Sequence, residues 1–147
     1  EMLLKATHLY TRSVTEVEKM YKYIVFNCLI GNGDAHLKNF ALQYSADMKN
    51  IFVSPPFDIT HTLIYQSIDN KMALKLAGSK MFPDLSHLIK LAESDHFRIR
   101  NPKEIIESFS ENILDYLHTS NEVQLFDGLR TSIEHSISNI MTSSPNT

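Results

Sequence analysis

A polar stretch of ten residues, GNGDAHLKNF (Gly31 to Phe40), limits what this 147-residue chain can fold into. It holds two glycines, two asparagines, an aspartate, a histidine and a lysine, and apolar runs flank it on both sides. Such a segment does not continue a buried helix or strand, because each buried polar group needs a hydrogen-bond partner. It is therefore a solvated turn or a functional loop. Taken alone, GNGD favours a turn, since Gly, Asn and Asp tolerate turn conformations.

The segment before this loop predicts a helix from about Ser13 to Ile30. Apolar residues recur there at three- and four-residue spacings and form one stripe. Gly31 is expected to end the helix, because glycine readily takes the left-handed conformation. Two pairs match the reciprocal capping pattern at a helix start, Ser13 with Glu16 and Thr15 with Glu18.

The rest of the chain predicts a small sheet followed by helices. Two short strands are expected at NFALQY and NIFVS, a third at Met72–Leu76, and helices at Leu85–Glu93, about Asn101–His118 and about Asn121–Met141. FDITHTLIYQS is ambiguous between strand and loop, and the terminal TSSPNT is expected to fray. No linker or repeat divides the chain. The order predicts one domain, residues 1–147, of the α+β class with helices dominating.

Charge and composition exclude several classes of function. The net charge of -3 and the absence of a Lys/Arg run give no general attraction to nucleic acid or anionic membrane. No apolar stretch approaches the ~20 residues that span a bilayer. Cys28 is the single cysteine, and its apolar context YIVFNCLI predicts a core residue. This cysteine usage favours a reducing compartment, so a cytoplasmic location is expected.

Three polar residues in the middle of the chain have the spacing of a phosphoryl-transfer site. Asp34 and Asn39 form the pattern D-x-x-x-x-N, and Asp58 ends SPPFD after the predicted hairpin. This is the layout of a protein-kinase catalytic centre. A carboxylate beside the substrate hydroxyl can accept its proton. Amide and carboxylate oxygens are the hard ligands that Mg²⁺ prefers beside nucleotide phosphates.

Three ordered segments, IGNGDAHLKNFAL, VSPPFDIT and MALKLAGSK, resemble the C-terminal half of the HipA family of serine/threonine kinases. These kinases are toxins of toxin–antitoxin systems. The family's loop reads G-N-x-D-x-H-x-K-N and its metal-binding segment reads S-P-x-[FY]-D. The matching residues here are Gly31, Asn32, Asp34, His36, Lys38 and Asn39, then Ser54, Pro55, Phe57 and Asp58. The resemblance implies the C-terminal lobe of a protein-kinase-like fold.

The resemblance also implies a role for each site residue. Asp34 resembles the catalytic base that orients the substrate hydroxyl, and Asn39 and Asp58 resemble the Mg²⁺ ligands. His36 and Lys38 resemble residues that face the phosphates of ATP, so His36, Lys38, Asn39 and Asp58 would together bind the Mg-ATP cofactor. With three motifs in order, the active-site interpretation is preferred over the turn.

The lobe that covers ATP in a kinase has no counterpart in this sequence. The chain has four glycines and nothing like G-x-G-x-x-G, and thirty residues precede Gly31. We therefore expect a C-terminal lobe that is inactive alone and needs an N-terminal lobe from the same gene or another chain. The start at Glu1 leaves three alternatives: a fragment, a split-kinase subunit, or a truncated, inactive relative that binds partners. The resemblance implies a HipB-like antitoxin as partner and a protein substrate, with aminoacyl-tRNA synthetases as a class.

Overall fold

The computed structural model describes residues 1–65, 69–94, 97 and 99–142. The helices are α1 (Met2–Thr11), α2 (Val14–Leu29), α3 (Leu85–Glu93), α4 (Pro102–Thr119) and α5 (Leu129–Thr142), with 3-10 turns η1 (Leu37–Asn39) and η2 (Val123–Leu125). The strands β1 (Leu42–Tyr44) and β2 (Ile51–Val53) form one antiparallel hairpin, and β3 (Lys71–Leu76) and β4 (Ser79–Met81) form another. The predicted α+β class with helices dominating is confirmed.

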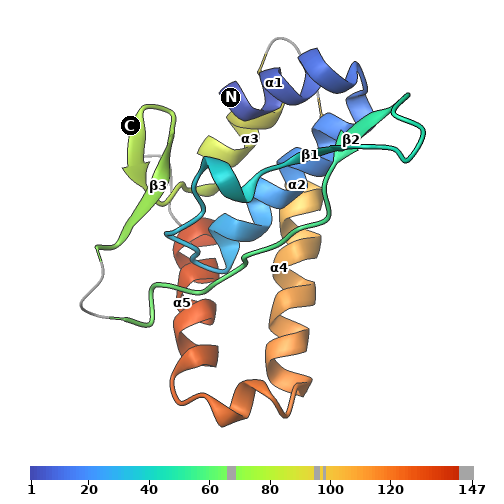
Figure 1. Cartoon of the computed structure of the whole chain (residues 1–147). Coiled ribbons are helices and arrows are strands. Elements are labelled where there is room, and N and C mark those ends of the chain that lie inside the picture. The colour runs from blue at the N-terminus through green and yellow to red at the C-terminus, as the bar shows by residue number, and fades with distance from the viewer. Residues whose placement is uncertain (66–68, 95–96, 98, 143–147) are drawn as a thin grey trace.

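Helix α2 is the central element of the core, and it contacts α1, α4, α5 and β2. Val17, Tyr21, Val25 and Leu29 lie four residues apart on it and have no exposed surface. Burying an apolar side chain of this size stabilises a fold by about 1.5–3 kcal/mol. Figure 1 shows α4 and α5 running side by side away from the two hairpins. The apolar stripe predicted for this helix is confirmed along its buried face, whereas Val14, at the first position of the helix, is 58% exposed.

The start of α2 agrees with the predicted boundary but only half of the predicted capping pattern forms. Ser13 is the N-cap, and its Oγ accepts a hydrogen bond from the N–H of Glu16 at 3.3 Å. The Glu16 carboxylate does not return to Ser13. Its Oε2 accepts from the N–H of Val53 in β2 at 2.7 Å, and its Oε1 from Nζ of Lys19 at 2.6 Å. Glu16 therefore connects α2 to the first hairpin.

The predicted elements around the first hairpin needed correction. The strand expected from Asn39 begins only at Leu42, because Asn39 belongs to the turn η1. Helix α1 and strand β4 were not predicted. The glycine turn expected after β3 is confirmed, since Ala77 and Gly78 have φ of 50° and 83°, the left-handed values of a tight hairpin turn.

The C-terminal third follows the prediction with one break. Helices α3 and α4 lie where Leu85–Glu93 and Asn101–His118 were expected. The helix expected from Asn121 is interrupted: η2 comes first, Gly128 has φ 75°, and α5 starts at Leu129. The described part of FDITHTLIYQS, up to Tyr65, forms neither helix nor strand. The last two residues of that segment and all but Thr142 of TSSPNT lie outside the described residues.

Cys28 lies in the core, as predicted. It is 4% exposed, and burial raises the pKa of its thiol to about 12. Across the residues that the structure describes, no helix combines the length and the apolar character needed to cross a bilayer.

Candidate active site

Two segments that are distant in sequence meet beside α2. The loop between α2 and β1 carries Asp34 and Asn39, and the segment that leaves β2 carries Asp58. Nδ2 of Asn39 donates a hydrogen bond to Oδ2 of Asp58 at 2.5 Å across nineteen positions. Asn39 is 3% exposed, whereas Asp58 is exposed. The fold therefore brings these two predicted ligands into direct contact, and Asp58 is the one of the two that solvent reaches.

A buried pair of asparagines holds the loop that carries Asp34. Asn32 is 2% exposed, and its Nδ2 donates to Oδ1 of Asn27 on α2 at 2.7 Å. Its Oδ1 accepts from the N–H of Asp34 at 3.1 Å and from the hydroxyl of Thr60 at 3.2 Å. Thr60 comes two residues after Asp58. Asn32 thus connects the backbone of the predicted base to the segment of the predicted cation ligand.

Gly33 lies where the loop passes close to the second hairpin. Its N–H donates to Oγ1 of Thr62 at 2.8 Å, and its carbonyl accepts from the N–H of Ala73 in β3 at 2.8 Å. A Cβ atom on Gly33 would stand 2.8 Å from the carbonyl oxygen of Lys71. A side chain does not fit there without moving the backbone. The close approach requires glycine here, whereas Gly31 is needed for its left-handed φ of 70°.

Tyr23 of α2 holds the second segment. Its side chain is 5% exposed, and its ring packs against Phe40 with centroids 4.9 Å apart. Its hydroxyl accepts from the N–H of Phe57 at 3.1 Å and lies 2.8 Å from the Phe57 carbonyl oxygen and 3.0 Å from that of Asn39. The next residue, Asp58, has φ 54°, an uncommon conformation for a residue other than glycine.

His61 connects this segment to two helices. Its Nδ1 lies 2.5 Å from the carbonyl oxygen of Ile30, just past α2, and its Nε2 lies 2.7 Å from Oγ of Ser132 on α5. Burial lowers the pKa of His61 and outweighs the opposite effect of the bond to Ile30. A neutral ring satisfies both contacts by donating from Nδ1 and accepting at Nε2. His61 therefore has a structural partner on each side.

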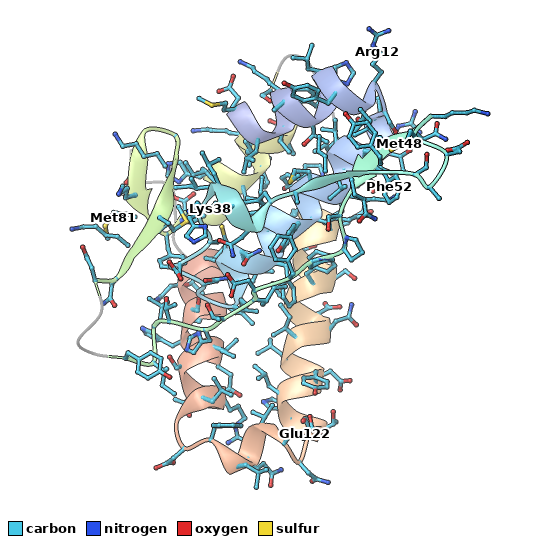
Figure 2. All side chains as sticks on the ribbon, in the orientation of Figure 1. Arg12, Lys38, Met48, Phe52, Met81 and Glu122 are labelled. Atoms are coloured by element: carbon cyan, nitrogen blue, oxygen red, sulfur yellow. The ribbon has the colours of Figure 1, made fainter. Side chains whose placement is uncertain are left out.

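The predicted site residues are not all brought into mutual contact. Asn39 and Asp58 bond directly, and the backbone N–H of His36 donates to Oδ1 of Asn39 at 3.0 Å. His36 is half-buried and joins the site through its main chain. Lys38 is exposed on η1, where Figure 2 shows it. Asp34 is exposed, and its N–H donates to Asn32. Its carbonyl accepts from the N–H of His36 at 2.7 Å, the same N–H that donates to Asn39, and Asn39 in turn bonds to Asp58.

The types of ligand at Asn39 and Asp58 fit a hard divalent cation. One amide oxygen and one carboxylate suit Mg²⁺, which keeps waters and takes further ligands from phosphates. The amide must turn for this, because Asn39 points its nitrogen at Asp58 while its oxygen accepts from His36. Among the described residues, no group of three or more His, Cys, Asp or Glu could hold a metal ion. The protein by itself thus offers a partial coordination shell.

The residues of α2 that hold the two segments of the site by hydrogen bonds were not predicted from the sequence. Tyr23 binds the backbone of Asn39 and of Phe57, Asn27 binds Asn32 of the loop, and Glu16 binds Val53 of the first hairpin. One signal was available: Asn27 interrupts the apolar run YIVFNCLI, and a buried amide needs a partner. Nothing in the sequence pattern distinguishes Tyr23 from the other aromatic residues of the helix.

Comparison with known proteins identifies the family of this chain. Residues 1–117 match the model of the HipA-like C-terminal domain, and the chain therefore belongs to that family. It is 34% identical over 103 residues to "Putative kinase Y4dM" of Sinorhizobium fredii, covering 66% of this chain and 25% of that protein. It is 35% identical over 65 residues to "Putative kinase Y4mE" of the same organism, covering 44% of this chain and 15% of that protein. The chain thus spans a quarter or less of these relatives, whose names support a relationship to kinases.

Proposed function

We propose that this chain supplies the catalytic loop and the cation ligands of a serine/threonine protein kinase that uses Mg-ATP. The contact between Asn39 and Asp58 carries the proposal. Two oxygen-bearing side chains from separate segments meet, while Asp34 is exposed on the same loop as Asn39. The family relationship and the kinase names of both relatives support it.

Each residue has one role in the proposed reaction. The hydroxyl oxygen of the substrate attacks the γ-phosphorus of ATP, the bond to the β–γ bridging oxygen breaks, and ADP leaves. The carboxylate of Asp34 orients the hydroxyl and accepts its proton. Asn39 and Asp58 would hold Mg²⁺, which offsets negative charge on the phosphates when bound. Lys38 is exposed beside them and offers positive charge to the same phosphates, with His36 as a hydrogen-bonding neighbour.

The rest of the ATP site would come from an N-terminal lobe. Apolar residues next to the site support this, since Leu37, Phe57 and Ile59 are 57%, 42% and 37% exposed. Apolar side chains on the two segments of one site are suited to contact with a covering lobe. By analogy with the family, the remaining partners would be a HipB-like antitoxin and a protein substrate, for which aminoacyl-tRNA synthetases are the first class to test.

The proposal is tested with aspartate variants of the intact natural protein. Asp34→Ala should abolish phosphorylation and leave the midpoint of urea unfolding unchanged, because its side chain is exposed. Asp58→Asn should instead weaken Mg-ATP binding, measured by calorimetry. Asp47→Asn is the matched control, an exposed aspartate in the turn between β1 and β2. Near-normal turnover of the Asp34 variant would exclude the proposed role. Wild-type protein without Mg-ATP binding would favour the partner-binding alternative.

A further inference from the structure

Tyr23 lies where the two segments of the candidate site meet the core. Its hydroxyl contacts the backbone of Asn39 and both the N–H and the carbonyl oxygen of Phe57. One of these residues is a proposed cation ligand, and the other directly precedes the second ligand, Asp58. The phenol is 5% exposed, so it has little access to solvent. It touches neither proposed ligand through the oxygens that would bind the cation.

The hydrogen-bonding capacity of a phenol explains how one side chain can hold both segments. The hydroxyl has a single proton and can also accept. The N–H of Phe57 donates to it at 3.1 Å. The proton is directed to the carbonyl of Phe57 at 2.8 Å or of Asn39 at 3.0 Å. The phenol itself is buried, so a shift of either segment away from it leaves the hydroxyl with fewer hydrogen-bond partners, which is unfavourable.

The backbone at Asp58 makes this support necessary. Its φ of 54° is a sparsely populated conformation that persists only where the surrounding contacts hold it. The N–H of Phe57 donates to the Tyr23 hydroxyl, and the Phe57 carbonyl oxygen lies 2.8 Å from it, so Tyr23 restrains the direction in which the chain enters Asp58. The packing of Phe40 on the Tyr23 ring restrains the chain on the other side of Asn39.

We propose that Tyr23 is a positioning residue that sets the separation between the cation ligands Asn39 and Asp58. This inference rests on the proposed function, because it concerns the same cation site. Without the hydroxyl, the two ligands move apart more freely and bind a divalent cation more weakly. The hydrogen bonds of the Tyr23 hydroxyl go to Asn39 and Phe57, whereas the N–H of Asp34 donates to Asn32, so we expect the loss to concern the cation first.

The matched control lies two residues away on the same helix. Tyr21 is also fully buried, and its hydroxyl donates to the carbonyl of Leu88 at 3.1 Å, away from the site. Tyr23→Phe and Tyr21→Phe each remove one buried hydroxyl and keep the ring. If loss of stability were the only effect, both variants would bind cations alike.

The experiment measures Mn²⁺ binding by electron paramagnetic resonance in the intact natural protein, with a non-hydrolysable ATP analogue present. We expect Tyr23→Phe to weaken Mn²⁺ binding about tenfold or more, as changes behind a metal ligand typically do, and Tyr21→Phe to stay within about twofold of the wild type. Amide hydrogen exchange without cation gives a second measurement. The N–H of Phe57 should exchange faster in Tyr23→Phe than in Tyr21→Phe.

An Asp58→Ala variant distinguishes a failure of the proposed function from a failure of the proposed role of Tyr23. If this variant binds Mn²⁺ and nucleotide as the wild type does, the proposed cation site is wrong, and the proposed role of Tyr23 is then wrong as well. If it loses binding while Tyr23→Phe behaves like Tyr21→Phe, the proposed function stands and the role of Tyr23 is overturned. Unchanged exchange at Phe57 in Tyr23→Phe would also overturn that role.

Discussion

Replacing Glu16 with alanine tests how the first hairpin is held against α2. Glu16 is 8% exposed, and its carboxylate accepts from the N–H of Val53 at 2.7 Å and from Lys19 at 2.6 Å. The alanine variant leaves the buried N–H of Val53 without this partner, which costs about 1–3 kcal/mol. The Lys19 side chain is largely exposed, so the lost ion pair adds at most about 0.5 kcal/mol. The expected decrease in the free energy of unfolding is therefore about 1–3.5 kcal/mol.

Glu18→Ala on the same helix is the control. Glu18 pairs with Lys22 at 2.6 Å on the surface, where such pairs contribute about 0.5 kcal/mol or less. Urea unfolding of the wild type and both variants, followed by circular dichroism, measures the difference. If Glu16→Ala costs no more than Glu18→Ala, the carboxylate does not hold the hairpin.

The same residue predicts a pH dependence. Burial raises the pKa of Glu16, but the hydrogen bonds from Lys19 and Val53 outweigh it and bring the pKa below its ordinary value of 4.5. A carboxylate with a depressed folded-state pKa stabilises the fold above 4.5, and this contribution is lost as the pH falls through the folded-state value. The stability difference between the wild type and Glu16→Ala should shrink below pH 4.5. A constant difference down to about pH 3 would refute the reasoning.

Three further outcomes are expected from the same structure. Gly33→Ala should cost about 3 kcal/mol in unfolding free energy, because its Cβ would stand 2.8 Å from the carbonyl oxygen of Lys71. Gly128→Ala has open space and should cost only about 1 kcal/mol for its left-handed backbone; equal costs would contradict the steric argument. His61 has a lowered pKa, so stability should fall as the pH drops below 6.5, and His61→Gln should flatten this slope in urea midpoints. Cys28 should resist thiol reagents in native buffer and react on unfolding; rapid native labelling would contradict its burial.

Local signals in the sequence predicted a large part of the fold. The apolar stripe of α2 and its end beside Gly31 depend on neighbouring residues along the chain, and the structure agrees with them. The same holds for the positions of α3 and α4. The break at Gly128 was missed, because the apolar pattern continues across it while the backbone does not. Periodicity describes which face of a segment is apolar and says little about where a helix is interrupted.

The long-range hydrogen bonds explain what the pattern could not show. Ser13 and Glu16 match a capping box, yet the carboxylate bonds to Val53, thirty-seven positions away. The local bond back to Ser13 competes with a buried N–H of β2 that needs an acceptor. Leaving the buried N–H without a partner costs more free energy than leaving the local bond unmade. Which of the two prevails depends on where β2 packs, and that position is not encoded in the capping pattern.

The sequence by itself determined the candidate ligands and their order: Asp34, Asn39 and Asp58 on a loop and a segment separated by a hairpin. It did so because their chemistry and spacing are properties of the chain. Only the tertiary structure decided that Asn39 meets Asp58, and that Tyr23 and Asn32 hold the two segments together. Buried polar groups must find partners in three dimensions, and those partners are chosen by how the helices and hairpins pack.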